Sequence, residues 1–143
     1  MNACLILAHN ESKFIEKNVT EVISLFELVI VVNDGSTDDT KDILENLTYD
    51  NLKIINNQKN LGAGKSLEIG INEFKNSSCN NLIKIDGDGQ FKLSDIKRLI
   101  SLSKNDYDFV KWDRFCESGI EGEIPTIRYV GTALASLFIK IST

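Results

Sequence analysis

Cysteine is scarce in this chain of 143 residues, and its pattern argues against a disulfide-stabilised fold. The three cysteines are Cys4, Cys79 and Cys116, and no two of them form a CxxC pair. An odd number without paired spacing is typical of proteins that stay in a reducing compartment. We therefore expect small buried thiols and a cytoplasmic location.

Basic charge and long apolar runs are lacking as well. The 16 lysines and arginines stand against 21 aspartates and glutamates, which gives a formal net charge of −5 and disfavours general binding to nucleic acid. No apolar run approaches the roughly 20 residues that a membrane span needs. No basic segment precedes the apolar residues that follow Met1 and Asn2, as a signal peptide would require. The sequence predicts a soluble protein without a nucleic acid partner.

What the chain does contain is an ordinary globular composition, with 42% hydrophobic and 26% charged residues. Its length fits one domain with a single core. We find no internal repeat, low-complexity tract or linker, so the whole of residues 1–143 is predicted to be one domain.

Apolar segments and helical periodicity alternate along this domain. Continuous apolar runs predict buried strands at residues 3–8, 28–32, 52–55, 82–85 and 108–112. Helical spacing of apolar residues predicts helices at 14–26, 36–47, 65–74, 94–103 and 127–141. Ser36 and Asp39 resemble a capping box at the start of the second helix. Alternation of this kind predicts an α/β fold with a mostly parallel sheet and right-handed crossovers.

Polar segments follow three of the predicted strands at the point where each strand ends. They are Asn10-Glu11, Asn33-Asp34 and the segment from Asp86 to Gln90. Ligands of open parallel sheets sit at the carboxyl ends of the strands, so these segments are expected to meet at one edge.

The segment Asp86-Gly87-Asp88-Gly89-Gln90 carries the strongest chemical signal. Two carboxylates one residue apart turn toward the strand end, and the glycines leave room for a bulky anion. A hard cation such as Mg²⁺ or Mn²⁺ takes one or two carboxylates together with substrate phosphates, and Gln90 adds an amide oxygen. A solvated turn is an equally good interpretation of this segment by itself.

Asp34 is the second candidate, because it ends a buried strand of apolar residues. A carboxylate there can accept hydrogen bonds from the N–H edge of a uracil or a guanine. Ser36, Asp38 and Asp39 are explained by a helix cap and the helix dipole. Asp34 lies outside that explanation.

Four motifs occur in order along the chain. They are Ala8-His9-Asn10-Glu11, the run from Val32 to Asp38, Asn60-Leu61-Gly62 with Gly64 and Gly70, and the run from Asp86 to Gln90. Together they resemble the motifs of family 2 glycosyltransferases, whose GT-A fold is a Rossmann-like, mostly parallel sheet flanked by helices. The tail and the Gln90 variant are most similar to the branch of dolichyl- and polyprenyl-phosphate mannosyltransferases. Their signature residues here are Gln90, Asp95, Ile96, Asp108, Phe109, Val110, Arg114, Arg128 and Gly131.

The resemblance implies roles for individual residues. The donor nucleotide is expected to contact Ala8, Glu11, Asp34, Asp86 and Gly87, with Glu11 and Asp34 at its ribose and base. Asp86, Asp88 and Gln90 are the expected ligands of a Mg²⁺ or Mn²⁺ ion that bridges the diphosphate. As catalytic residues we expect Asp86 and Asp88 together with Arg114 and Arg128, which match basic positions facing an acceptor phosphate. Surface charge is the alternative interpretation of the two arginines.

The chain also departs from the family pattern. Leu7 stands where the family usually has proline, His9 where it has tyrosine, and Asn33 where it has a second aspartate. We interpret His9 as a substitute for an aromatic ring near the base. Catalytic domains of the family continue past the end of this chain, so the acceptor side is predicted to be incomplete.

The resemblance implies a metal-dependent, inverting glycosyltransferase that uses a UDP- or GDP-linked sugar. The expected acceptor is a polyprenyl phosphate, which implies peripheral contact with the cytoplasmic face of a membrane and a role in cell-envelope glycan or glycolipid synthesis. A saccharide acceptor and a non-catalytic nucleotide-sugar-binding module are the alternatives. A nucleotidyltransferase is disfavoured, because no glycine-rich basic loop follows the first strand. An α/β domain without any site would bind no nucleotide.

Overall fold

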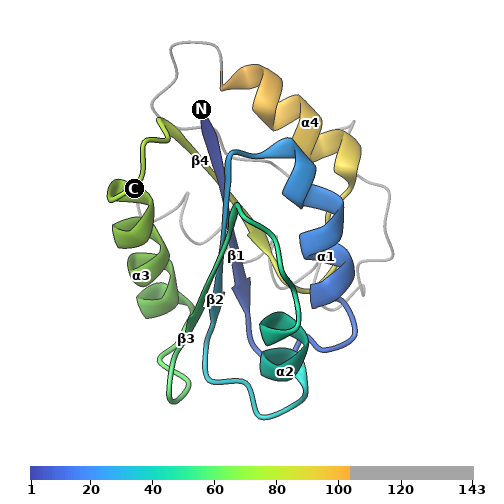
Figure 1. Cartoon of the computed structure of the whole chain (residues 1–143), viewed down its shortest axis with the longest axis vertical. Helices are drawn as coiled ribbons and strands as arrows, with labels where there is room; N and C mark the ends of the chain where they lie inside the picture. The colour runs from blue at the N-terminus through green and yellow to red at the C-terminus, as the bar shows by residue number, and fades with distance from the viewer. Residues whose placement is uncertain (104–143) are drawn as a thin grey trace, which may run out of the picture. The chain divides into compact units, whose positions relative to one another are not determined.

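A four-stranded parallel sheet forms the centre of the computed structural model, which describes residues 1–103 (Figure 1). Its strands are β1 (Asn2–Ala8), β2 (Leu28–Asn33), β3 (Leu52–Asn56) and β4 (Asn81–Asp86), in the spatial order β3-β2-β1-β4. All three strand pairings are parallel. The predicted α/β fold with a parallel sheet flanked by helices is confirmed, and the predicted strand at 108–112 and helix at 127–141 lie outside the described residues.

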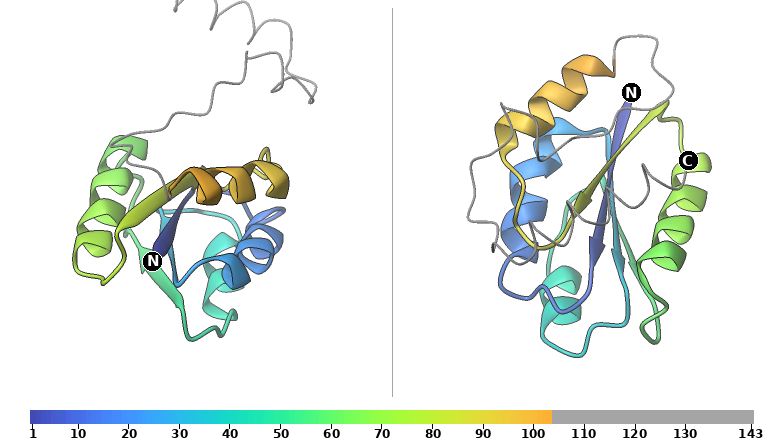
Figure 2. Two further views of the ribbon diagram at one scale, coloured as in Figure 1. Left: turned by 90° about the horizontal axis from the view of Figure 1, so that it is seen from above. Right: turned by 180° about the vertical axis from the view of Figure 1, so that it is seen from behind.

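Helices cover both faces of this sheet. The described helices are α1 (Ile15–Val22), its 3₁₀ continuation η1 (Ile23–Leu25), α2 (Thr40–Glu45), α3 (Ala63–Lys75) and α4 (Leu93–Leu102). Figure 2 shows α1, α2 and α4 on one face of the sheet and α3 on the other. No helix within residues 1–103 is long and apolar enough to cross a membrane.

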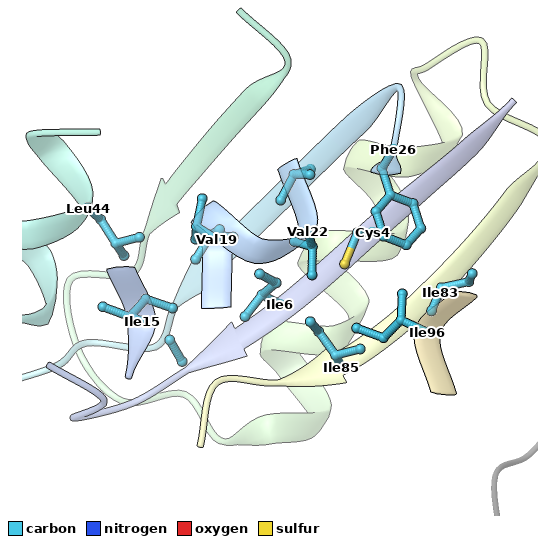
Figure 3. Close-up of a cluster of buried hydrophobic side chains, with 13 residues drawn as sticks. Cys4, Ile6, Ile15, Val19, Val22, Phe26, Leu44, Ile83, Ile85 and Ile96 are labelled. Atoms are coloured by element: carbon cyan, nitrogen blue, oxygen red, sulfur yellow. The ribbon is translucent and has the colours of Figure 1, made fainter. Parts of the chain in front are cut away.

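The alternation of strand side chains divides the interior into two clusters. Cys4 and Ile6 of β1 point into the larger one, with apolar residues of α1, α2 and α4 (Figure 3). Leu5, between them in sequence, faces the smaller cluster under α3. Burial raises the pKa of Cys4 strongly, so its thiol stays protonated and acts as a small apolar side chain. The expectation of a buried thiol is confirmed for Cys4, whereas Cys79 is half-buried.

Two predicted helix boundaries are wrong. The helix expected from residue 36 begins at Thr40, and its N-cap Asp39 makes no side-chain capping bond. The Ser36 hydroxyl, predicted to cap the helix, donates instead to Oδ1 of Asn33 at 2.5 Å. The helix expected to reach residue 26 ends its α-helical part at Val22, because the chain turns through η1 into extended backbone before β2.

Candidate functional site

The ends of β2 and β4 lie on either side of the end of β1. In the register of the sheet, Leu7 is opposite Asp86 and Ala8 is opposite Asn33. Beyond the strands, the Asp34 N–H donates to the Ala8 carbonyl at 2.8 Å and the Gly87 N–H donates to the Leu7 carbonyl at 2.9 Å. The three polar segments predicted to meet at one edge do meet there.

The acidic segment after β4 is open to solvent. Asp86 and Gln90 are exposed, Asp88 is half-buried and Gly87 is buried. The Lys84 ammonium donates a hydrogen bond to Oδ1 of Asp86, and the two side chains form an ion pair. Oδ1 of Asp88 accepts the Gln90 N–H at 3.1 Å, which closes a small turn. A carboxylate offers about four lone-pair positions, so neither contact exhausts Asp86 or Asp88 as a ligand.

Glu11 lies within the field of this acidic segment. The pKa of Glu11 is raised first by its partial burial and then by the negative charges of Asp88, Asp38 and Asp86, while His9 lowers it. Carboxylates from three different segments thus repel one another at the same edge. A bound cation would relieve this repulsion.

The carboxylates do not by themselves form a complete metal cage. Within residues 1–103, no group of three or more His, Cys, Asp or Glu side chains is arranged to hold a metal ion. The predicted ligands Asp86 and Asp88 would therefore be two carboxylates only, with the amide of Gln90 nearby in sequence. Mg²⁺ characteristically binds through one or two carboxylates and completes its shell with water and substrate phosphates. This pair fits such a shared site and not an all-protein one.

Asp34 is buried, with 5% of its surface exposed, and its carboxylate holds the loop of residues 57–62. Its Oδ1 accepts the Leu61 N–H at 2.8 Å and the Asn57 amide at 2.9 Å, and its Oδ2 accepts the Gly62 N–H at 2.9 Å. Burial alone would raise the pKa of Asp34, but these hydrogen bonds and one from Ser66 outweigh it and hold the pKa below its usual value. Asp34 is therefore an ionised anchor for this loop.

The loop that Asp34 holds borders an open depression of about 540 Å³ at the end of β3. Its lining residues are mostly amides and a lysine: Asn56, Asn57, Gln58, Lys59 and Leu61. Sequence reasoning placed Asn60-Leu61-Gly62 among the motifs but did not connect this loop with Asp34. The loop lies close to Asp34 because β2 pairs in parallel with β3, with Asn33 opposite Asn56.

His9 braces the same loop. Its Nδ1 lies 2.8 Å from the carbonyl oxygen of Asp34, and its Nε2 lies 3.1 Å from Nδ2 of Asn60. An amide nitrogen donates and a carbonyl accepts, so the contacts assign the proton of a neutral ring to Nδ1. His9 thus joins the ends of β1 and β2 to Asn60. Its role near the base stays a prediction.

A set of side chains joins the turn after β1 to the loop after β2. Asn10 has the left-handed value φ 58°, and its Oδ1 accepts the Thr37 N–H at 2.8 Å. The Glu11 N–H donates to the Thr40 hydroxyl at 2.8 Å. Asp38 accepts the Ser12 N–H at 3.1 Å and the Thr40 N–H at 3.0 Å. These contacts fix where Glu11 lies.

Asp38 belongs to this set as an ionised acceptor. Burial opposes ionisation, but the hydrogen bonds from Thr40 and Ser12 outweigh it and lower the pKa of Asp38 to about 2. Sequence reasoning explained Asp38 as a helix cap only. It missed Ser12, because no local pattern predicts a bond between residues 26 positions apart, and it gave Thr40 no role although Thr40 lies only two residues from Asp38.

Arg114 and Arg128, the predicted contacts of an acceptor phosphate, lie outside the described residues. The remaining predicted residues, Ala8, Glu11, Asp34, Asp86, Gly87, Asp88 and Gln90, all follow or end β1, β2 and β4 at the same edge of the sheet. Which of them contact a ligand stays a prediction.

Comparisons with known proteins place this chain among glycosyltransferases. The sequence model described as "Glycosyl transferase family 2" matches residues 4–136. An uncharacterized glycosyltransferase of Haemophilus influenzae is 35% identical over 109 residues, which cover 72% of this chain and 33% of that relative. A dolichyl-phosphate beta-glucosyltransferase of Trichomonas vaginalis is 29% identical over 108 residues, which cover 66% of this chain and 31% of the relative. The chain thus spans about a third of the length of these relatives.

Among solved structures, the chain is similar to glucosyl-3-phosphoglycerate synthase from Mycobacterium tuberculosis in complex with UDP. The TM-score is 0.49 at 21% sequence identity, and the likeness covers 62% of this chain and 34% of that protein.

Proposed function

The chain belongs to glycosyl transferase family 2, and we propose that it forms the donor-binding part of a glycosyltransferase that transfers a sugar from a nucleotide to a polyprenyl phosphate. The main support is the gathering of Glu11, Asp34 and the pair Asp86 and Asp88 at the carboxyl edge of the parallel sheet. Ligands of such sheets bind at this edge.

Asp34 suits the base of the nucleotide. Hydrogen bonds from the loop of residues 57–62 and from Ser66 keep its carboxylate ionised, and we propose that this carboxylate also accepts an N–H from a uracil or guanine edge. The depression beside Asp34 is lined by amide side chains that can bind further polar atoms of a base. Glu11, which follows β1 at the same edge, would accept hydrogen bonds from hydroxyl groups of the ribose.

The acidic segment suits the diphosphate. We propose that Asp86 and Asp88, with Gln90, hold a Mg²⁺ or Mn²⁺ ion there, because two carboxylates plus phosphate oxygens satisfy such an ion. When bound, the ion would act as a Lewis acid that stabilises the negative charge of the departing diphosphate. The carboxylates would orient the donor. The pKa of Glu11 is raised first by burial and then by the negative charges of Asp88, Asp38 and Asp86, and this concentration of negative charge favours cation binding.

Names of relatives support the lipid-phosphate acceptor. Two relatives in Trichomonas vaginalis are dolichyl-phosphate beta-glucosyltransferases. A phosphate monoester with a second pKa of about 6 is mostly anionic at neutral pH, so it attacks the sugar without a general base. Attack from the face opposite the leaving diphosphate inverts the anomeric carbon. We assign Arg114 and Arg128 to the acceptor phosphate, and peripheral contact with the cytoplasmic face of a membrane follows from a lipid acceptor.

A second candidate is a module that binds the nucleotide sugar without transferring it. The described residues that would bind the donor are the same for both candidates. Assays with polyprenyl phosphate and with saccharide acceptors separate the two candidates. Binding without transfer to any acceptor supports the module, and transfer to saccharides alone refutes the lipid acceptor.

Calorimetric titration tests donor binding directly. The 143-residue chain is titrated with UDP, GDP and their sugar conjugates, first with Mn²⁺ and then with a chelator. We expect binding that depends on the ion and that weakens by at least ~10-fold in Asp88→Ala, because loss of even an outer-shell partner costs that much. Asp50→Ala is the matched control, since Asp50 is exposed just before β3, where the strands begin and not where they end. Equal binding with chelator, or no binding at all, would refute the proposal.

A further inference from the structure

One polar residue occupies the apolar face of α1. Asn18 is 2% exposed, and its neighbours on that face, Ile15, Val19 and Val22, are fully buried. A buried amide costs free energy unless it is hydrogen-bonded, whereas a leucine of similar volume would simply add to the core. Packing alone therefore does not account for an asparagine here.

The partner of this amide lies in the acidic segment after β4. Nδ2 of Asn18 donates to the carbonyl oxygen of Gly87 at 2.7 Å, across a sequence separation of 69 residues. The other backbone polar group of Gly87, its N–H, donates to the Leu7 carbonyl at 2.9 Å. Both backbone groups of the residue between Asp86 and Asp88 are thus bound to the scaffold.

The fit around this glycine is close. A Cβ atom on Gly87 would lie 2.9 Å from the Leu7 carbonyl oxygen and 3.3 Å from Ala8, so a side chain there would push the segment away from β1. Two residues on, a Cβ on Gly89 would lie 3.1 Å from the ring of Phe14, the N-cap residue of α1. The start of α1 therefore supports the acidic segment at two points.

These contacts hold the backbone between the two acidic residues, Asp86 and Asp88. The Gly87 carbonyl belongs to the peptide that leads into Asp88, so a rotation of this peptide would change the direction of the Asp88 side chain. We propose that Asn18 is a positioning residue, whose amide fixes the Gly87–Asp88 peptide so that both carboxylates face a nucleoside diphosphate with its cation. This inference rests on the proposed function.

The test compares two asparagines whose side-chain amides donate to backbone carbonyls. One lies near the end at which the parallel strands finish and the other near the end at which they begin. Asn18→Leu removes the donor to Gly87, and Asn18→Ala does so without added bulk. Asn51→Leu is the matched control. Nδ2 of Asn51 donates to the carbonyls of Ile23 and Phe26 at 2.8 and 2.9 Å, ahead of β3 and far from the acidic segment in the fold.

Affinity for UDP with Mn²⁺ is the first measurement, by calorimetry on the 143-residue chain. We expect both Asn18 variants to lose roughly 10- to 100-fold in affinity, as is typical when an outer-shell partner of a metal site is removed. Asn51→Leu should keep the wild-type affinity although it too loses stability. Wild-type affinity in both Asn18 variants would overturn the inference.

The second measurement needs no ligand. Amide hydrogen exchange at Gly87, compared with that at Ile30 in the centre of the sheet, should accelerate in both Asn18 variants and not in Asn51→Leu. Unchanged exchange at Gly87 would refute the role of Asn18 even if the chain binds no UDP. Absence of UDP binding in the wild type, by contrast, refutes the proposed function, and the two failures are thereby distinguished.

Discussion

Replacing Asp34 by asparagine should loosen the loop of residues 57–62 by a predictable amount. The new side chain has the same shape, but one oxygen becomes an NH₂ group that can no longer accept. The best orientation keeps the oxygen at Oδ1, where it accepts from Leu61 and Asn57, and places the NH₂ group against the Gly62 N–H. Gly62 retains its second acceptor, Oδ1 of Asn60 at 2.9 Å, which limits the loss.

The magnitude follows from these contacts. A hydrogen bond to a charged group contributes about 1.5–3 kcal/mol. Because the Gly62 N–H is shared between Asp34 and Asn60, we take the lower value, about 1.5 kcal/mol, for the bond that is lost there. The two bonds that remain lose their charge assistance, which roughly halves each of them. We expect Asp34→Asn to lower the free energy of unfolding by about 3 kcal/mol in total.

Urea denaturation at neutral pH measures this change, with Asp50→Asn as an exposed control that should leave stability unaltered. Hydrogen exchange should localise the effect to the amides of Leu61 and Gly62. A loss below about 0.5 kcal/mol, the scale of an ordinary surface substitution, would show that the Asp34 carboxylate does not anchor the loop.

Further predictions concern acidity, repulsion and close packing. Asp34 and Asp38 have folded-state pKa values below their ordinary value of 3.8, so the stability that they contribute is complete above that pH and is lost as pH falls toward about 2, the pKa of Asp38. Acid titration followed by circular dichroism should show this loss of stability, and Asp38→Asn should make the loss smaller. Glu11 has a raised pKa, so its ionised form opposes folding. Glu11→Gln should therefore raise the midpoint of thermal unfolding at pH 7 and weaken UDP binding. A lower midpoint would contradict the repulsion among Glu11, Asp88, Asp38 and Asp86. Gly35→Ala should cost about 3 kcal/mol or more in urea denaturation, because Gly35 has φ 61° and a Cβ would lie 2.2 Å from the backbone of Lys59; a tolerated alanine would refute this packing of the loop against β2.

Much of the fold could be predicted because its signals are local. The apolar runs of β1, β2 and β4 reveal buried strands wherever they occur, and their alternation with helical periodicity leaves few topologies other than a parallel sheet. The meeting of Glu11, Asp34 and Asp88 at one edge then follows, because parallel strands end on the same side. Ser36 shows where the capping pattern fails. Its hydroxyl accepts the Asn10 N–H and donates to Oδ1 of Asn33, and the helix begins only at Thr40.

The sequence by itself therefore determined the strands, their common edge and the chemical types of residue gathered there. Tertiary structure decided how those residues are held. The strand order puts Gly87 beside Leu7 and within reach of Asn18, and the pairing of β2 with β3 brings residues 57–62 onto Asp34. Such bonds join residues that lie 23 to 69 positions apart, and no periodicity within a single segment encodes which distant donor will meet a given acceptor.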